Sequence, residues 1–569
     1  MINLLPEPKE LLDHHGLTAP FASLCLTGAD ESQLELARLR FWNYQDIPLG
    51  FSLETLPSPL VLELIPSLND PGQVATPLFI SQGYQLEIAP GKATLRFQEK
   101  AGYINGLTSL KQLIKQTDEG FVLPLCRILD YPSLAVRAVA PTFSWYAGYG
   151  RIGFDMQLWG YEEWAEFLNI SLDNKINQFN MVMYGYWPFE FEEYPETVFR
   201  DIPVRIWNAE NHSWLTVRYS HPNIEKPYLK DLIRLAHKLE FRIFAYVGLN
   251  SYNGAYSIKH PEARTKPPET GGFLNDFDSL CLSYPGTKDY ILNSMRRIAE
   301  LGFDGFTLEE SEEGFWYCQC DGCLKQWHSQ AASPGEAKHK ANMWLLSQIY
   351  KTVRDVNPEA VLGIRAFRQP PLEKDPAFLR ESARAMPEDI KLFWAPGLYV
   401  PETEFDKWCD AFGKERIWGR DSEANSITST MGRLFRTFKS NVIRYEDEAN
   451  EQIIETDIRQ HMGSVRRGVH GINGYMFEWF GLFMFEFAHG NYGWGSQMAP
   501  EVFYLQACRL NFGHLGDRVL SAIQSILTIH ESQIPLYSTP FPFQKNKMTR
   551  RIFLPSCGPR RTIRRCSRS

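Results

Sequence analysis

The sequence lacks several features that would place it in common functional classes. No apolar run among its 569 residues is long enough to span a bilayer. The N-terminus, MINLLPEPKELLDHHG, carries acids and no long apolar segment, so we expect no signal peptide and a cytoplasmic protein. The formal net charge of −8 argues against a polyanionic partner. We therefore expect neither a membrane nor a nucleic-acid partner.

Two further patterns are missing. The ten cysteines are scattered apart from one cluster and show no pattern typical of secreted, disulfide-bonded proteins. No glycine-rich phosphate-binding loop follows a predicted strand, which argues against a nucleotide-binding open sheet. We therefore expect no cofactor.

Aromatic residues, by contrast, are abundant. They make up 14% of the chain, with 15 Trp and 25 Tyr. Aromatic rings fill hydrophobic cores and also stack on sugar rings, so this excess is compatible with a carbohydrate ligand without establishing one. With 569 residues and a hydrophobic content of 44%, the chain is expected to form two or three globular domains.

Residues 1–130 predict a small α+β domain. Three segments, 60–65, 84–88 and 93–97, have the residue pattern of strands. Residues 101–114 repeat apolar side chains at helical spacing, which predicts an amphipathic helix packed on that sheet.

Residues 131–515 show a repeated order of strand, loop and helix. Helical patterns cover 228–239, 287–301 and 340–356. The predicted strands are 137–143, 178–184, 241–247, 303–308, 360–366, 390–394, 416–418 and 471–477, with a ninth candidate at 441–445. Eight or nine strands of this kind predict an α/β fold with a (β/α)8 barrel of the TIM type. A doubly wound open sheet is the alternative.

Residues 516–569 are expected to form a helix followed by a tail. From Lys545 onward the chain carries nine Lys or Arg and no acid, without helical or strand periodicity. This segment is either a basic interaction tail or a stretch whose reading frame is out of register. We expect disorder in both cases.

The segment Gly302–Cys323, GFDGFTLEESEEGFWYCQCDGC, is the most informative part of the chain. A short apolar strand is followed directly by Glu309 and Glu310, and then by further acids, three consecutive aromatics and three cysteines. Barrels of the α/β type place catalytic groups at the C-terminal ends of their strands. The order of strand, acids and aromatics therefore favours a functional site over a solvated acidic loop.

Two motifs resemble family 20 glycoside hydrolases. RILDYPSLAVR, Arg127–Arg137, is similar to the junction that opens the barrel in that family, and GLTSLKQL, residues 106–113, resembles the helix of the small domain before it. The resemblance implies an acidic pair, usually Asp-Glu, at the end of the fourth barrel strand, where Glu309-Glu310 stands. It also implies that Arg137 binds sugar hydroxyls; an ion pair at the domain junction is the alternative.

The chain departs from that family at the acidic pair. Glu309 stands where the family has Asp, and the His-x-Gly-Gly that usually precedes the pair is absent, which argues against an amino sugar. The same architecture is also similar to family 67 glucuronidases and family 84 hexosaminidases.

The acids suit the cleavage of a glycosidic bond. The reaction needs a proton for the leaving oxygen and a negative charge near the oxocarbenium-like centre. We assign Glu310 as the general acid, with Glu309 as its electrostatic partner or, for a 2-acetamido sugar, as the residue that orients that group. Without that group a second carboxylate is needed, and Glu478 is the first candidate because it follows a predicted strand. Asp421, which we also assign to substrate binding, and Glu423 are further candidates, each of which could instead be a capping or salt-bridge residue.

Six aromatic residues stand at or just beyond predicted strand ends. They are Trp145, Tyr184, Trp187, Trp394, Trp418 and Trp479. A Trp in a barrel enzyme is more often part of the core than a ligand contact, so we expect about two or three of the six to face a sugar-binding cleft.

One cysteine cluster, Cys318-x-Cys320-x-x-Cys323, forms part of a zinc-binding pattern. The paired second half is missing, so the fourth ligand would be His328 or none. We favour reduced loop thiols here. A metal at this place would be structural, and the nearby acids would remain the catalysts.

The sequence thus predicts an exo-acting glycoside hydrolase that cleaves a terminal sugar of hexosaminide or uronide type from an oligosaccharide or glycoside. A non-hydrolytic carbohydrate-binding barrel is the second hypothesis. A metal-dependent barrel hydrolase that uses the thiols is the third.

Overall fold

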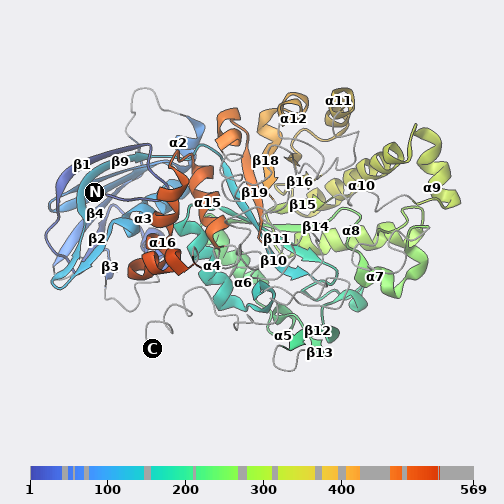
Figure 1. The fold of residues 1–569 in the computed structure, drawn as a ribbon, viewed down its shortest axis with the longest axis horizontal. Helices are drawn as coiled ribbons and strands as arrows, with labels where there is room; N and C mark the ends of the chain where they lie inside the picture. The colour runs from blue at the N-terminus through green and yellow to red at the C-terminus, as the bar shows by residue number, and fades with distance from the viewer. Residues whose placement is uncertain are drawn as a thin grey trace.

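The computed structural model describes residues 2–41, 49–54, 58–68, 76–145, 155–208, 213–266, 279–309, 318–365, 375–394, 405–422, 462–476, 483–522 and 525. Within these residues a mixed N-terminal sheet packs beside a closed barrel of parallel strands (Figure 1). The segments 441–445 and 545–569 lie outside the described residues. No helix in the described part of the chain is long and apolar enough to cross a lipid bilayer.

The N-terminal sheet has seven strands in the order β1-β9-β5-β6-β4-β2-β3. β1, β9, β5 and β6 pair antiparallel, whereas β6, β4, β2 and β3 pair parallel. The strands are β1 (Glu10–Leu17), β2 (Ser23–Thr27), β3 (Gly50–Ser52), β4 (Pro59–Ile65), β5 (Tyr84–Ala89), β6 (Lys92–Phe97) and β9 (Pro124–Asp130), with a small hairpin of β7 (Lys115–Thr117) and β8 (Gly120–Val122). The three strands predicted in this region are therefore present.

The helix α3 (Lys100–Leu113) lies between this sheet and the barrel. It packs on β5 and β6 and also contacts α1 (Glu31–Arg40) and the barrel helix α4 (Tyr161–Asp173). Nearly every residue from Gly102 onward is buried. Gly106 allows the close approach to the sheet, because a Cβ at this position would lie 2.4 Å from a methyl group of Leu95. A short helix, α2 (Pro77–Gln82), packs against the same helix.

The barrel has eight parallel strands, and β10 pairs with both β11 and β19, which closes the ring. The strands are β10 (Val136–Trp145), β11 (Gln178–Tyr184), β14 (Arg242–Gly248), β15 (Gly305–Glu309), β16 (Val361–Arg365), β17 (Lys391–Trp394), β18 (Ile417–Ser422) and β19 (Gly471–Met476). All eight predicted strands are present, with small differences at their ends. The predicted (β/α)8 fold is confirmed, and the open doubly wound sheet is wrong.

Helices surround the barrel on its outer side (Figure 1). The longer ones after α4 are α6 (Leu229–Lys238), α8 (Pro285–Glu300), α10 (Pro334–Val356), α11 (Pro376–Ala385), α12 (Phe405–Phe412), α15 (Phe483–Trp494) and α16 (Pro500–Phe512). Shorter elements are α5 (Pro222–Glu225), α7 (Gly254–Lys259), α9 (Asp321–Gln326) and a hairpin of β12 (Ile202–Asn208) and β13 (Ser213–Tyr219).

Side chains fill the barrel interior in layers. The layer near the N-terminal ends of the strands is apolar and contains Phe244, Phe393 and Trp418. Beside it Gln178, Asn180 and Asn473 form a hydrogen-bonded row of amides, with bonds of 2.8 and 2.7 Å. An aromatic layer near the C-terminal ends includes Tyr184 and Tyr246. Trp418 was expected at a rim; it is instead fully buried in the apolar layer and is the second residue of β18.

Buried charges join the small domain to the barrel. The guanidinium of Arg40 on α1 and the ammonium of Lys111 on α3 donate to the two oxygens of Asp173 on α4, at 2.6 and 2.7 Å. The Arg40 side chain is fully buried, and the side chains of Lys111 and Asp173 are almost fully buried. The pairs hold α1 and α3 of the small domain on one barrel helix.

We expect Asp173→Asn to lower the free energy of unfolding by about 3–5 kcal/mol, because it leaves two buried cations without their counter-ion. Urea unfolding at neutral pH measures the change. Asp201→Asn is the matched control, since it breaks the Arg218–Asp201 pair, which is exposed and screened by solvent and should contribute little to stability. Equal effects of the two variants would contradict the role given to Asp173.

Candidate functional site

Glu309 is the last residue of β15, the fourth strand of the barrel. Its side chain is 1% exposed and projects into the barrel interior, whereas the preceding Leu308 packs in the core between strands and helices. The hydroxyl of Tyr184, at the C-terminal end of β11, donates a hydrogen bond to Glu309 Oε2. The first acid of the predicted pair thus occupies the expected strand end and has a fixed direction.

Hydrogen bonds also hold the backbone of Glu309. Its carbonyl oxygen accepts hydrogen bonds from the backbone N–H of Leu249, at 2.7 Å, and from the hydroxyl of Ser251, at 3.2 Å. Both donors belong to the turn that follows β14. In this turn Tyr252 adopts a left-handed backbone conformation, with φ of 59°, which is unusual for a residue with a side chain. Such strain is often found at functional sites.

The strained conformation of Tyr252 accompanies a stacked pair of rings. The rings of Tyr252 and Tyr184 are nearly parallel, with centroids 3.8 Å apart. Trp145 contacts both rings edge-on, at 5.4 and 6.3 Å. The three aromatic side chains form a wall beside Glu309 and restrict the position of the Tyr184 hydroxyl.

A β-bulge brings Trp145 to this wall. On β10, Ala138 and Ala140 face the interior, so Trp145 would face outward in a regular strand. The pairing with β11 shifts by one residue between Thr142 and Ser144, and Trp145 then pairs with Tyr184. A bulge of this kind re-aims the side chains that follow it.

Electrostatics keep Tyr184 as a hydrogen-bond donor. Burial and the neighbouring Glu309 carboxylate raise the pKa of Tyr184 well above its usual value. The hydroxyl therefore retains its proton throughout the ordinary pH range. The resulting arrangement is a buried, oriented acceptor that can hold an N–H group of a ligand or stabilise a nearby positive charge.

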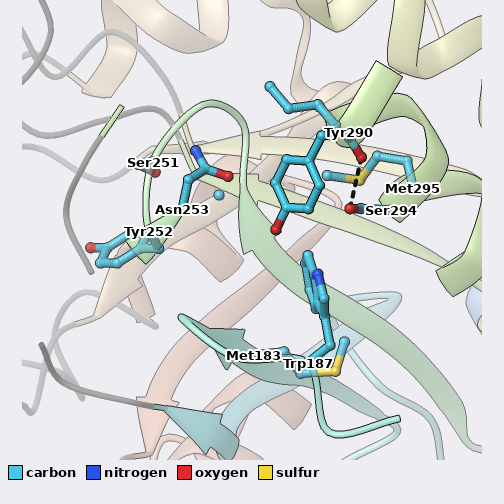
Figure 2. A pocket seen from close by; sticks show the side chains of 10 residues that line it. Met183, Trp187, Ser251, Tyr252, Asn253, Tyr290, Ser294 and Met295 are labelled. Carbon is cyan, nitrogen blue, oxygen red and sulfur yellow. Dashed lines mark hydrogen bonds between the residues drawn. The ribbon is translucent and has the colours of Figure 1, made fainter. Parts of the chain in front are cut away.

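A second group of residues surrounds a small cavity behind the barrel wall (Figure 2). Met183, Trp187 and Met295 line it, together with Tyr290 on α8. Figure 2 shows Trp187 and Tyr290 directed toward each other, with the ring of Tyr252 turned away from both. Met183 and Tyr184 are adjacent in β11 and project to opposite sides. The part of the cavity that Met183 lines therefore lies outside the barrel, and Trp187 points to this part; Ser251 and Tyr252, from the turn after β14, line the cavity as well.

Arg137 is placed away from Glu309. It is the second residue of β10, at the opposite end of the barrel, and its side chain is 1% exposed. Its guanidinium donates to the carbonyls of Lys175 and Leu134, both at 2.7 Å, and to Gln82 Oε1 at 3.0 Å. Val136 and Ala138 face the interior, so residue 137 projects outward into the domain junction. These hydrogen bonds fit a structural role at the domain junction, and the sugar-binding role expected for Arg137 stays a prediction.

The remaining predicted site residues are less fully described. Trp394 ends β17 and Asp421 lies in β18, where it pairs with Asn473, so both belong to the barrel. Four further candidates lie outside the described residues: Glu310, Glu423, Glu478 and Trp479. Their roles stay predictions.

The three predicted metal candidates come together with a fourth cysteine. The Sγ atoms of Cys318, Cys320 and Cys323 lie within 4.8 Å of one another and of Cys281 Sγ. His328, the predicted fourth ligand, instead places Nε2 3.0 Å from the carbonyl oxygen of Cys318. Cys281 precedes the motif by 37 residues, in the loop before α8, so motif spacing gave no signal for it.

Sequence reasoning also missed the residues that hold Glu309. Ser251 and Tyr252 lie in GLNSYNG, a turn-like segment after a predicted strand, and their proximity to β15 follows only from the neighbouring position of β14 in the barrel. Their place directly after the third strand is the one signal that could have found them.

Comparisons with known proteins agree with this architecture. Residues 2–131 match the family model described as glycosyl hydrolase family 20, domain 2. The GH20 β-N-acetylhexosaminidase from Streptomyces coelicolor A3(2) has a similar fold, with a TM-score of 0.60 at 12% identity, over 95% of this chain and 98% of that one. The β-N-acetylhexosaminidase from Bacteroides fragilis has a TM-score of 0.60 at 12% identity, over 92% and 95%.

A third similar structure contains a sugar. The GH20 exo-β-N-acetylglucosaminidase from Vibrio harveyi, in complex with N-acetylglucosamine, has a TM-score of 0.53 at 11% identity, over 92% of this chain and 78% of that one. No curated protein sequence matches the chain. The predicted resemblance is confirmed for the order and fold of the domains: a segment that matches family 20 domain 2 precedes a barrel whose fold is similar to that of the family 20 hexosaminidases named above.

Proposed function

We propose that this chain is an exo-acting glycoside hydrolase that removes a terminal sugar by carboxylate acid/base catalysis. The observation that carries the proposal is Glu309 at the end of the fourth barrel strand, buried and held by Tyr184. Glu310 follows it directly in the sequence. Related glycosidase folds support this assignment.

The two acids have different tasks in the proposed reaction. Glu310 donates a proton to the leaving oxygen, which requires a carboxyl group whose proton is retained until the bond breaks. Glu309 remains an acceptor, because the Tyr184 hydroxyl donates to it. In that state it can orient the N–H of a 2-acetamido group, so that the carbonyl oxygen of the same group acts as internal nucleophile.

The substrate we favour is a terminal N-acetylhexosaminide. The similar proteins named above are β-N-acetylhexosaminidases, and the Vibrio harveyi protein holds N-acetylglucosamine. The missing His-x-Gly-Gly points the other way, to a sugar such as a uronide. For such a sugar Glu478 would supply the second carboxylate, about 5–9.5 Å from Glu310.

A panel of 4-nitrophenyl glycosides tests the proposal. We expect release of 4-nitrophenol from the N-acetyl-β-glucosaminide or N-acetyl-β-galactosaminide. Release only from the glucuronide would support a glycoside hydrolase but would show that its substrate is a uronide rather than an N-acetylhexosaminide. Binding of these sugars without release from any of them would instead support a non-hydrolytic carbohydrate-binding barrel.

Glu310→Gln should lower kcat on an unactivated glycoside by about 10²–10⁴-fold, because it removes the proton donor. The loss should be smaller on 4-nitrophenyl substrates, whose leaving group needs less protonation. Steady-state kinetics on both kinds of substrate measure the contrast. Near wild-type turnover of the unactivated glycoside would reject Glu310 as the general acid.

Tyr184→Phe should lower kcat/KM by about 10- to 100-fold, because a hydrogen bond to a charged group contributes about 1.5–3 kcal/mol and 1.36 kcal/mol is a tenfold rate change. Tyr103→Phe is the matched control: its buried hydroxyl donates to the carbonyl of Gln33 in the small domain, at 2.8 Å. We expect the control to lose stability and to keep its activity. Equal kinetic losses in the two variants would mean that Tyr184 acts through stability alone.

A further inference from the structure

We propose that Cys281, Cys318, Cys320 and Cys323 bind one structural zinc ion as four thiolates. Cys281 Sγ lies 3.5 Å from Cys320 Sγ and 3.8 Å from Cys323 Sγ, and all four sulfurs lie within 4.8 Å of one another. A tetrahedron with Zn–S bonds of about 2.3 Å has sulfur–sulfur edges of about 3.8 Å. The cluster therefore has the size of a tetrathiolate zinc site.

The cluster is not a pair of disulfides. The four cysteines are free thiols, and the distances of 3.5 and 3.8 Å are far longer than an S–S bond of about 2.05 Å. Three of the four are buried, and Cys320 is half-buried. Four soft ligands gathered in one mostly buried group are typical of zinc or of iron bound to sulfur.

Neighbouring groups are arranged to stabilise thiolates. The backbone N–H of Lys266 donates to Cys318 Sγ and that of Cys323 donates to Cys320 Sγ, both at 3.4 Å. The Ser283 hydroxyl lies 3.2 Å from Cys323 Sγ. Hydrogen bonds of this kind orient metal ligands and offset their negative charge.

The glycine in Cys320-Asp321-Gly322-Cys323 lets the two loops approach. A Cβ at Gly322 would lie 2.7 Å from the Cβ of Ser283, which is too close for any side chain. The loop that carries Cys281 and Ser283 can therefore pack directly on the Cys320–Cys323 turn. The separation in sequence between Cys281 and the other three explains why the second half of the metal pattern is not visible as a motif.

The zinc ion fixes two loops at the edge of the candidate site. Cys281 follows Leu280, whose backbone N–H and carbonyl both bond to the side chain of Asn250, at 3.1 and 2.9 Å. Asn250 lies between Leu249 and Ser251, the two residues that bond to the Glu309 carbonyl. Cys318 ends the segment that begins at Glu310.

Four sulfur ligands complete the coordination of a tetrahedral zinc ion and leave no position for a reactive water. The ion is therefore structural, and the third hypothesis, a metal-dependent hydrolase that uses the thiols, is not favoured.

The test is the metal content of the full chain, purified under reducing conditions and dialysed without added metal. We expect one zinc per chain by elemental mass spectrometry. Replacement by Co²⁺ should give the intense visible absorption of a tetrahedral thiolate complex. Cys281→Ser should lose the zinc, whereas Cys409→Ser, which changes a buried cysteine on α12, should retain it.

The metal content and the Co²⁺ spectrum of the wild-type chain test the zinc site even if a cysteine variant does not fold. Absence of bound zinc in the wild-type chain, with no tetrahedral Co²⁺ spectrum after metal addition, would overturn it. Stoichiometric iron would overturn the choice of metal. Full zinc content in a folded Cys281→Ser variant would overturn the ligand set. None of these readouts depends on glycosidase activity, so the zinc site and the proposed function fail separately.

Discussion

The alternation of side chains along the closed barrel decides which residues can reach the candidate site. Successive residues of a strand project to opposite sides, and closure makes one of those sides a filled interior. On β15 this rule sends Leu308 to the outer core and Glu309 inward, and on β11 it places Tyr184 beside that carboxylate. A shift of one residue on β11 would turn Tyr184 away from this contact, and the same shift on β15 would bury Glu309 among the apolar side chains outside the barrel.

The same alternation places charged side chains on the outer side of the barrel, in the buried junction with the small domain. Arg137 projects outward from β10, stacks on the ring of Trp494 at 4.9 Å and lies close to Lys175 and Asp130. Burial lowers the pKa of Arg137 to about 9 and that of Lys175 to about 7, while it raises the pKa of Asp130. Since desolvation offsets much of the attraction between buried ions, these charges are weak evidence for a net gain in stability.

The barrel could be predicted from the sequence because each of its strands is an apolar run separated by helical patterns, which is a local signal. In the small domain, β1 and β9 were missed: β1, ELLDHHGL, is polar and mostly exposed, and its pairing with β9 joins segments more than a hundred residues apart. Glu309 was found because strand and acids are contiguous. Cys281 and Tyr252 were missed because their contacts depend on which loops are neighbours in space.

One sequence-based expectation was wrong because a tryptophan suggested sugar binding at a position where the strand directs its side chain into the core. Trp418 stands near a strand start, so its ring fills the apolar interior layer rather than a cleft. At the C-terminal rim of the barrel, strand pairing ends; on β15 it ends at Glu309. Around this rim the described contacts come from loops: the turn at 249–253 bonds to the Glu309 carbonyl, and the four cysteines gather beside it in sequence-distant loops. Strand pairing fixes Glu309, and the proposed zinc would fix Cys318 and the other three cysteines. Such restraint lowers the entropy lost when a catalytic group is brought to its working position.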